Sequence, residues 1–255
     1  VTTLDRTFMG CTGLTTVTIP ETVESYVGVF NGCTGLISAV IESKADNIGG
    51  SNTSIASGVF GGCTNLKTVS VPKWVKVIGI AAFRDCSSLE TTDFIEQATT
   101  IKQQAFQGCT SLRGSLNLSA STIESLAFDK CLNLGDNISV ANTKSIGSNA
   151  FRDCSGINGI VYAQVISGGA NNFNSKSVTA LLNGGTFSVG EDLTADTLAT
   201  PAKDGYAFMG WYDNADFTGK AVTTPDAGKT YYAKWAEKAD QSITYENTAT
   251  EKHIN

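Results

Sequence analysis

The stretch Leu66-Lys-Thr-Val-Ser-Val-Pro-Lys-Trp-Val-Lys-Val-Ile-Gly-Ile-Ala-Ala-Phe-Arg-Asp-Cys86 holds one complete copy of the repeat that decides the fold. Apolar Val69 and Val71 alternate with polar residues, which predicts a short strand with one buried face. Pro72 then ends the strand, because proline has no backbone N–H to donate to a neighbouring strand. Gly79 permits the corner that follows. The stretch therefore predicts one coil made of a strand, a corner and an irregular or short helical return.

The frame Phe-x-x-Cys-x-x-Leu surrounds every cysteine of the chain, with Ile157 replacing the final leucine in the last copy. Successive cysteines are 22, 30, 23, 23, 22 and 23 residues apart. Repetition at a period of about 20–30 residues is typical of a leucine-rich solenoid. The structural residues of the seven copies are Phe8, Cys11, Phe30, Cys33, Phe60, Cys63, Phe83, Cys86, Phe106, Cys109, Phe128, Cys131, Phe151 and Cys154.

Stacking these units predicts a parallel sheet on one face of the solenoid and a continuous row of phenylalanines inside it, because each unit buries its apolar side only against its neighbours. We therefore predict an α/β leucine-rich-repeat solenoid over residues 1–177. The expected inward-facing strand pairs are Val17/Ile19, Val69/Val71, Thr92/Phe94, Leu116/Leu118, Ile138/Val140 and Ile160/Tyr162. A polar insertion within residues 42–54 is expected to bulge from one edge.

The cysteines have two interpretations. They are either small buried core residues at one equivalent position in each coil, or a redox or metal-binding set. Metal binding favours close pairs such as C-x2-C, and the sequence contains none. We favour the core interpretation and expect seven free thiols, no metal and no cofactor, with disulfides between neighbouring coils left open.

Composition excludes several classes of function. The chain has 255 residues, a net charge of −6 and a pI near 4.8, which disfavours binding to a phosphate backbone. No apolar window approaches the roughly 18 residues that a membrane-spanning helix needs. The single histidine, His253, lies in a polar tail, so a histidine-dependent catalytic triad is not expected.

The charge is unevenly distributed along the chain. Residues 1–177 hold 12 bases and 13 acids, whereas residues 178–255 hold 6 bases and 11 acids. This shift predicts a boundary near residue 178. Residues 178–236 alternate short apolar segments with turns, and their expected core is Phe208, Trp211, Tyr232 and Trp235. Residues 237–255 are polar and are interpreted as a linker or the start of a further module.

Two resemblances follow from these motifs. The unit L-x-x-V-x-I-P-x-x-V-x-x-I-G-x-x-A-F-x-x-C, best matched by Leu14 to Pro20 and Leu66 to Cys86, resembles BspA-like leucine-rich repeats. Asn183 to Thr186, Gly205 to Tyr212 and Tyr231 to Trp235 resemble one Listeria–Bacteroides (internalin B-type) repeat. These resemblances imply a bacterial cell-surface protein, adhesion through the solenoid, and a small β-grasp-like C-terminal domain. They also imply an extracellular location. Because Val1 begins the chain without a leader, we expect a chain that is processed or is a fragment of a longer protein.

The outward strand positions predict the binding face, which is small and polar. Its residues are Thr16, Thr18, Thr68, Ser70, Thr91, Asp93, Asn117, Asn137 and Ser139. The leading hypothesis is a non-catalytic protein that uses this face to bind a protein or glycoprotein on host or neighbouring cells. The second hypothesis is a structural stalk without a ligand. A carbohydrate-active enzyme is a remote third, because no aromatic platform occurs among the expected outward positions, which also include Ser38, Val40 and Val161.

Trp74 lies outside the apolar frame of the repeat. It is either an exposed contact anchor, since tryptophan is enriched at interface hot spots, or a side chain folded over the edge of the coil among lysine stems. The second interpretation is favoured.

Overall fold

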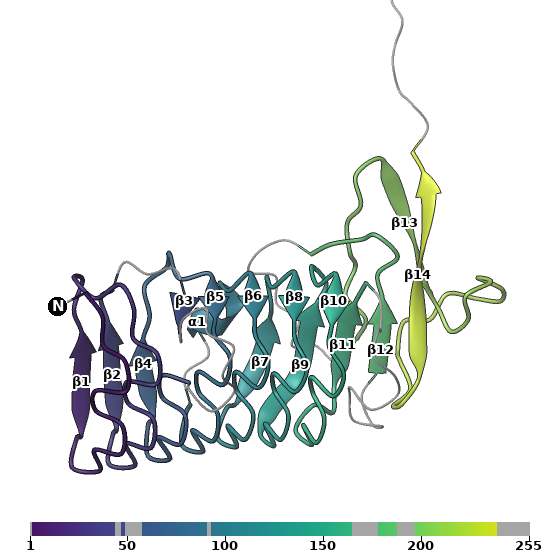
Figure 1. Cartoon of the computed structure of the whole chain (residues 1–255). Coiled ribbons are helices and arrows are strands. Elements are labelled where there is room, and N and C mark those ends of the chain that lie inside the picture. The colour runs from purple at the N-terminus through teal and green to yellow at the C-terminus, as the bar shows by residue number, and fades with distance from the viewer. Residues whose placement is uncertain are drawn as a thin grey trace, which may run out of the picture.

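The computed structural model describes residues 2–43, 47–48, 58–90, 93–164, 178–187 and 197–238. Figure 1 shows a solenoid whose coils follow one another from β1 (Thr16–Ile19) to β12 (Val178–Leu181), with a long hairpin at the far end. Parallel strands occupy one face. The described residues contain a single helix of four residues, so strands dominate the fold and the expected α/β character is not confirmed.

The N-terminal sheet contains β1, β2 (Ser38–Ile41) and β4 (Thr68–Ser70), all parallel. Each strand alternates between core and solvent. In β4, for example, Val69 is buried between exposed Thr68 and Ser70. The predicted parallel strands with one buried face are thus confirmed in this part of the chain.

A second parallel sheet, made of two-residue strands, lies along another side of the solenoid (Figure 1). Its members pair in parallel in the order β10-β8-β6-β5-β3. They are β3 (Asn47–Ile48), β5 (Val77–Ile78), β6 (Thr100–Ile101), β8 (Thr122–Ile123) and β10 (Ser145–Ile146). Ile78, Ile101, Ile123 and Ile146 are buried, so this sheet closes the core along the second side of the solenoid.

The C-terminal sheet has six strands in the order β13-β14-β12-β11-β9-β7. The strands are β7 (Gly114–Asn117), β9 (Leu134–Val140), β11 (Ile160–Ala163), β12, β13 (Tyr206–Tyr212) and β14 (Thr230–Glu237). Only the β13–β14 pair is antiparallel. The solenoid sheet therefore continues, through β12, into the C-terminal hairpin.

The helix α1 (Asp93–Glu96) separates the two sheets. The sequence predicts an inward-facing strand here from Thr92 and Phe94; Thr92 lies outside the described residues, and for Phe94 the predicted burial is confirmed but the predicted strand is wrong. Phe94 instead lies in the helix, with its ring centroid 5.3 Å from Phe83 and 6.1 Å from Phe106. Packing of this large ring against the core outweighs the alternating pattern of its neighbours.

Side chains next to α1 replace backbone pairing at the break between the sheets. The carboxylate of Glu96 accepts a hydrogen bond from the backbone N–H of Asn117 at 2.9 Å. The Gln97 amide donates to the backbone carbonyl of Pro72 at 3.1 Å. These bonds satisfy polar backbone groups on both flanking coils, which explains how the strand row is interrupted without leaving these two groups unpaired.

The phenylalanines of the repeat form a stacked column through the solenoid, as the sequence predicts. Neighbouring ring centroids are separated by 5.0 to 5.8 Å, and adjacent ring planes differ by at most 20°. All rings except that of Phe8 are buried; Phe8, at the N-terminal end, is 39% exposed. The column ends there on an open ring face.

Each cysteine from the second coil onward joins its coil to the preceding one. The thiol donates a hydrogen bond of 3.0 to 3.1 Å to the carbonyl oxygen of the preceding repeat phenylalanine. All seven cysteines are free. Six of the seven cysteines are buried, as the core interpretation predicts, whereas Cys11 is half-buried; the possibility of disulfides between coils is not realised in this structure.

The residue immediately before each cysteine adopts a positive φ. Four of these residues are glycines with φ between 72° and 76°, and three have side chains: Asp85, Lys130 and Asp153, with φ between 57° and 61°. Only glycine adopts this region without a steric penalty, so these three positions carry local strain.

Strand β11 faces the opposite way from the prediction. Val161 and Ala163 pack in the solenoid core, whereas Ile160 and Tyr162 belong to a second apolar cluster on the outer side of the sheet. The predicted inward pair Ile160/Tyr162 is therefore wrong by one residue, and so is the expectation that Val161 faces outward. A slip of one residue exchanges the two faces of a strand.

Contacts with the C-terminal part account for this register. The Tyr162 hydroxyl donates to the carbonyl of Thr197 at 3.4 Å and accepts from the N–H of Ala199 at 2.9 Å. Its ring meets Phe187 edge-on, with centroids 4.8 Å apart. Trp211 donates its indole N–H to the same Ala199 residue at 2.9 Å. Tyr162 is therefore the residue through which the outer side of the sheet holds the segment that precedes the hairpin.

The core of the hairpin differs by one residue from the prediction. Trp211 is buried, and Phe208 and Trp235 pack partly buried against the same cluster. Tyr231 is buried, whereas Tyr232, the predicted core residue, is only half-buried. The described residues show a hairpin added to the solenoid sheet, and a β-grasp-like fold is not confirmed.

Candidate binding site

The outer face of the N-terminal sheet presents two rows of side chains. Strand register places Thr16, Ser38 and Thr68 side by side in one row, and Thr18, Val40 and Ser70 in the next. All six are exposed except Ser38, which is half-buried. Four of the predicted binding residues, Thr16, Thr18, Thr68 and Ser70, are therefore brought together on one accessible surface.

The remaining predicted binding residues do not extend this surface. Asn137 and Ser139 are only 3% and 1% exposed, so the expectation that they are accessible is wrong. Asn117 is half-buried, Asp93 is exposed on α1 rather than on a strand, and Thr91 lies outside the described residues.

Burial of Asn137 and Ser139 follows from their hydrogen bonds and from the inverted register of β11. The Asn137 amide oxygen accepts the backbone N–H of Ile160 at 2.6 Å, and the Ser139 hydroxyl accepts the N–H of Ala141 at 3.5 Å. Ser139 also lies directly beside outward-facing Tyr162 in the sheet. These polar side chains therefore serve the structure, because buried polar groups need hydrogen-bond partners.

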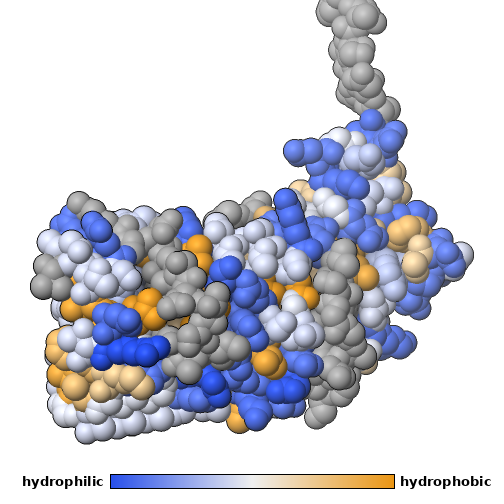
Figure 2. All heavy atoms as spheres, in the orientation of Figure 1, coloured by the Kyte–Doolittle hydropathy of each residue, from blue (hydrophilic) through white to orange (hydrophobic). Residues whose placement is uncertain are grey.

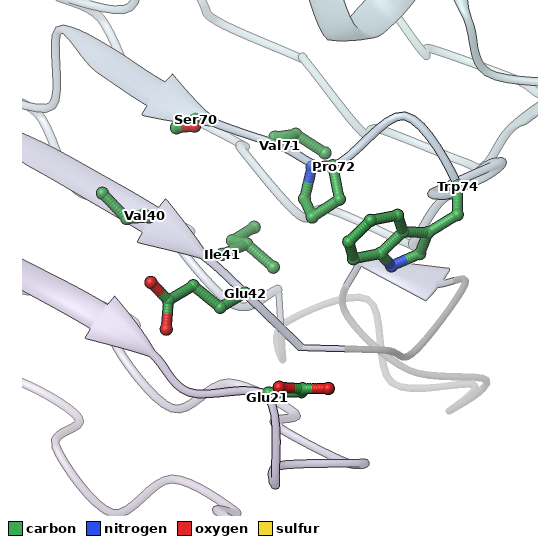
Figure 3. Close-up of a pocket in the computed structure, with 8 residues that line it drawn as sticks. All are labelled: Glu21, Val40, Ile41, Glu42, Ser70, Val71, Pro72 and Trp74. Carbon is green, nitrogen blue, oxygen red and sulfur yellow. The ribbon is translucent and has the colours of Figure 1, made fainter.

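A cavity of about 590 Å³ opens at the carboxyl ends of β1, β2 and β4. Its wall has apolar, aromatic and acidic parts. Figure 3 shows Trp74 and Pro72 on one side and the carboxylates of Glu21 and Glu42 on the other. The lining residues are Glu21, Val40, Ile41, Glu42, Ser70, Val71, Pro72 and Trp74.

Trp74 is positioned by the turn that follows β4. The backbone N–H of Val75 bonds to the carbonyl of Pro72 at 3.1 Å, and the Trp74 indole N–H donates to the carbonyl of Ser43, in the neighbouring coil, at 3.2 Å. The side chain nevertheless stays 52% exposed. Trp74 thus reaches across the coil edge, which is one part of the favoured interpretation, while its exposed ring surface is what the other interpretation, a contact anchor, requires.

Exposed apolar side chains concentrate at the N-terminal end of the solenoid. Five of the seven large hydrophobic residues that are exposed among the described residues belong to the first four coils: Phe8, Met9, Ile37, Val40 and Trp74. Figure 2 shows hydrophobic side chains gathered over the end that carries β1 and β2, between hydrophilic ones. The outer face and the cavity lie in this same part of the molecule.

A second, smaller hollow of about 230 Å³ lies on the return side of the coils. Gly58, Gly61 and Gly62 provide part of its lining. Arg84 beside it forms an ion pair with Asp85 at 3.4 Å. Because the charge of Arg84 is balanced by the carboxylate of Asp85, this pair gives the hollow no net charge.

Four of the buried thiols are expected to be poorly reactive. Burial raises the pKa of Cys63 to about 12, and burial likewise raises the pKa values of Cys86, Cys109 and Cys131 above the ordinary value. A protonated thiol is a poor nucleophile and a poor metal ligand. Within the described ranges, no group of three or more His, Cys, Asp or Glu side chains is arranged to hold a metal ion. No helix in the described ranges has the length and apolarity to span a membrane.

The sequence did not reveal the cavity, because its walls come from three coils. Glu21, Glu42 and Trp74 each follow a strand of the same sheet, and only stacking brings these positions together. The sequence feature that could have indicated the cavity is the shared position of these three residues just after a strand. None of them belongs to the apolar pattern of the repeat.

Comparison with protein families agrees with this architecture. Residues 2–52 and 47–158 match the BspA type leucine rich repeat region, in six copies, and residues 172–234 match the Listeria-Bacteroides repeat domain. The leucine-rich match covers more than half of the chain. The chain therefore belongs to the BspA-type leucine-rich repeat family, and it also carries a Listeria-Bacteroides repeat.

Solved structures similar to the chain include two leucine-rich repeat proteins. A leucine-rich repeat protein from Bacteroides ovatus is 22% identical, over 64% of this chain and 59% of that one, with a TM-score of 0.39. A leucine-rich cell surface protein from Faecalibacterium prausnitzii is 19% identical, over 71% of this chain and 52% of that one, also with a TM-score of 0.39. The match spans less than two thirds of either structure. No curated protein matches the chain.

Proposed function

We propose that this chain is a non-catalytic, extracellular binding protein that attaches to a protein or glycoprotein on another cell through the outer face of the β1–β2–β4 sheet. The observation that supports the proposal most is the contiguous exposed surface formed by Thr16, Thr18, Val40, Thr68 and Ser70. Membership of the BspA-type family and the Listeria-Bacteroides repeat support a place at the bacterial cell surface.

The composition of this face suits protein recognition. Val40, 39% exposed, lies in the row between the hydroxyl groups of Thr18 and Ser70. An apolar centre with a polar, hydrogen-bonding surround is the usual anatomy of a protein interface. Since these strand positions carry no charge, their contribution to specificity would come from hydrogen bonds and from shape, and that contribution should depend only weakly on salt.

A charge-insertion experiment tests this face. Thr16→Lys with Thr68→Lys places two lysines in the row that does not line the cavity, and Asn142→Lys, at an exposed position far along the solenoid, serves as the matched control. We expect saturable binding of the full chain to cultured epithelial cells or immobilised extracellular-matrix proteins, lost in the double variant and kept in the control. Unchanged binding of the double variant would reject this face.

A structural stalk is the second candidate, and one observation favours it. The sheet runs without a break in pairing from β11 through β12 into β14, so the solenoid and the hairpin are connected by backbone hydrogen bonds. Such a connection transmits orientation along the molecule. A stalk should show no saturable binding to any cell or matrix preparation, and this outcome would favour it over the adhesin.

A further inference from the structure

We propose that the cavity beside the β1–β2–β4 sheet binds a basic side chain, lysine or arginine, of the partner protein. This proposal rests on the proposed function and adds to it the chemical class of group that the partner inserts. The cavity joins the outer face directly, because Val40 and Ser70 belong to both surfaces.

The aromatic wall supplies the first element of recognition. The Trp74 side chain is half-exposed, and its hydrogen bond to the carbonyl of Ser43 fixes the indole from its N–H edge. A cation placed over an indole face is attracted by the negative charge of the π system, and tryptophan is the best of the aromatic side chains for this contact. The ring is thus held in place before any ligand arrives.

The acidic wall supplies the second element. Glu21 and Glu42 lie across the cavity from Trp74 (Figure 3), and none of the eight described lining residues is basic. A cation in this space would meet the carboxylate of Glu42 on one side and the indole of Trp74 on the other. The same charges disfavour phosphate, sulfate or carboxylate groups.

The apolar part of the lining supplies the third element. Val40, Ile41 and Val71 also line the cavity, and Ile41 lies between Glu42 and Trp74 (Figure 3). Lysine and arginine carry a hydrocarbon stem that packs on such surface while the charged head remains beside polar groups. The volume of about 590 Å³ exceeds a single side chain, so the residues flanking the cation would also enter.

The test uses the full chain and small probes in place of the unknown partner. The probes are Nα-acetyl-lysine methylamide, its arginine counterpart, and the norleucine methylamide as a neutral match of similar length. Two-dimensional NMR follows the indole N–H signals, of which the chain has three; Trp74→Phe assigns the signal of Trp74. We expect saturable shifts of that signal with lysine and arginine, with a Kd on the order of 1 mM, and none with norleucine.

Variants then separate the contributions of the acidic and the aromatic wall to lysine binding. We expect Glu42→Gln to weaken lysine binding about threefold and Trp74→Ala about fivefold, whereas Glu24→Gln, at an exposed carboxylate outside the cavity, leaves it unchanged. For Trp74→Ala, binding is followed by the backbone amide signals of the cavity. A folded-state spectrum that matches the parent outside the cavity shows that each variant is folded.

Two results would overturn the proposal. One is equal binding of norleucine and lysine, which would make the cavity a simple apolar pocket. The other is binding of a neutral oligosaccharide at Trp74 without binding of the cations, which would assign the cavity to sugars. Neither result affects the strand-face proposal, provided that Thr16→Lys with Thr68→Lys still abolishes cell binding. The two proposals can therefore be rejected independently.

Discussion

The thiol of Cys109 donates a hydrogen bond to the carbonyl oxygen of Phe83, one coil earlier, at 3.0 Å. The same oxygen accepts the backbone N–H of Cys86 at 3.1 Å. A carbonyl has two lone pairs, so each repeat phenylalanine with this arrangement is fully satisfied by the cysteines of its own coil and of the next. The repeated cysteine is therefore a core residue that also ties neighbouring coils together.

Thiol reactivity tests this role. At pH 8 we expect iodoacetamide to modify the native chain at Cys11, which is half-buried, far faster than at the six buried cysteines. Burial that raises the thiol pKa leaves little reactive thiolate. After unfolding in urea without reductant, mass spectrometry should find seven modified cysteines. Three disulfides in that sample would contradict the account.

Stability should also depend on pH in the alkaline range. The pKa of Cys63 is raised in the folded state to about 12, from an ordinary value of 9.0. The folded state therefore favours the neutral thiol. The resulting stabilisation is fully present below pH 9.0 and is lost as the pH rises toward 12. Between pH 7.5 and pH 10, the urea midpoint of unfolding should fall less in Cys63→Ala than in the parent protein. An equal fall in both would contradict a raised pKa of Cys63 in the folded state.

The phenylalanine column predicts a graded cost of truncation. Phe83→Ala removes a fully buried ring stacked between two others and should cost about 3–5 kcal/mol of unfolding free energy. Phe8→Ala, at the open end, should cost clearly less because that ring is 39% exposed. Urea denaturation measures both. A loss below about 1 kcal/mol for Phe83→Ala would remove this ring from the core.

Backbone strain before the cysteines can be relieved. Lys130 has φ of 61°, where four equivalent coils use glycine. Lys130→Gly removes this strain but also increases the conformational entropy of the unfolded chain, which opposes the gain. We therefore expect the free energy of unfolding to rise by about 0.5–1 kcal/mol in total. Lys144→Gly is the control, since Lys144 does not have a positive φ, and this change should destabilise. Destabilisation by both substitutions would show that Lys130 is unstrained.

The Tyr162 hydroxyl adds side-chain hydrogen bonds to the backbone pairing that connects the solenoid and the hairpin. Tyr162→Phe removes the bonds to Thr197 and Ala199 and should cost about 1–2 kcal/mol. Tyr212→Phe, whose hydroxyl makes no hydrogen bond among the described residues, should be nearly neutral. Thermal unfolding followed by tryptophan fluorescence compares the two variants, and similar stability would place the connection elsewhere.

The fold was largely predictable because its information is local and repeated. The spacing from Phe83 to Cys86 recurs in every coil, and neighbouring coils meet through identical positions, so one unit predicts the stack. The departures have non-local causes. Phe94 packs against two stacked rings of the phenylalanine column, and Tyr162 turns outward to meet residues more than twenty positions later in the chain.

The candidate site was predictable only where the sheet has no cover. Thr16 and Thr68 are exposed as alternation predicts, whereas Asn137 and Ser139 follow the same alternation and are buried. Alternation separates the residues of a strand into two faces, but it does not identify what packs on each face. For the same reason the cavity around Trp74 emerges only from the stacking of three coils.

Hydroxyl-radical footprinting of the chain bound to immobilised matrix proteins or cells tests the central claim most directly. Val40 and Trp74 on the proposed surface and Leu132 and Met209 elsewhere are all between 39% and 52% exposed in the free chain, which makes the second pair an internal control. We expect oxidation of Val40 and Trp74 to fall on binding while that of Leu132 and Met209 stays constant. Protection of Met209 or Leu132, with Val40 and Trp74 unchanged, would contradict the account.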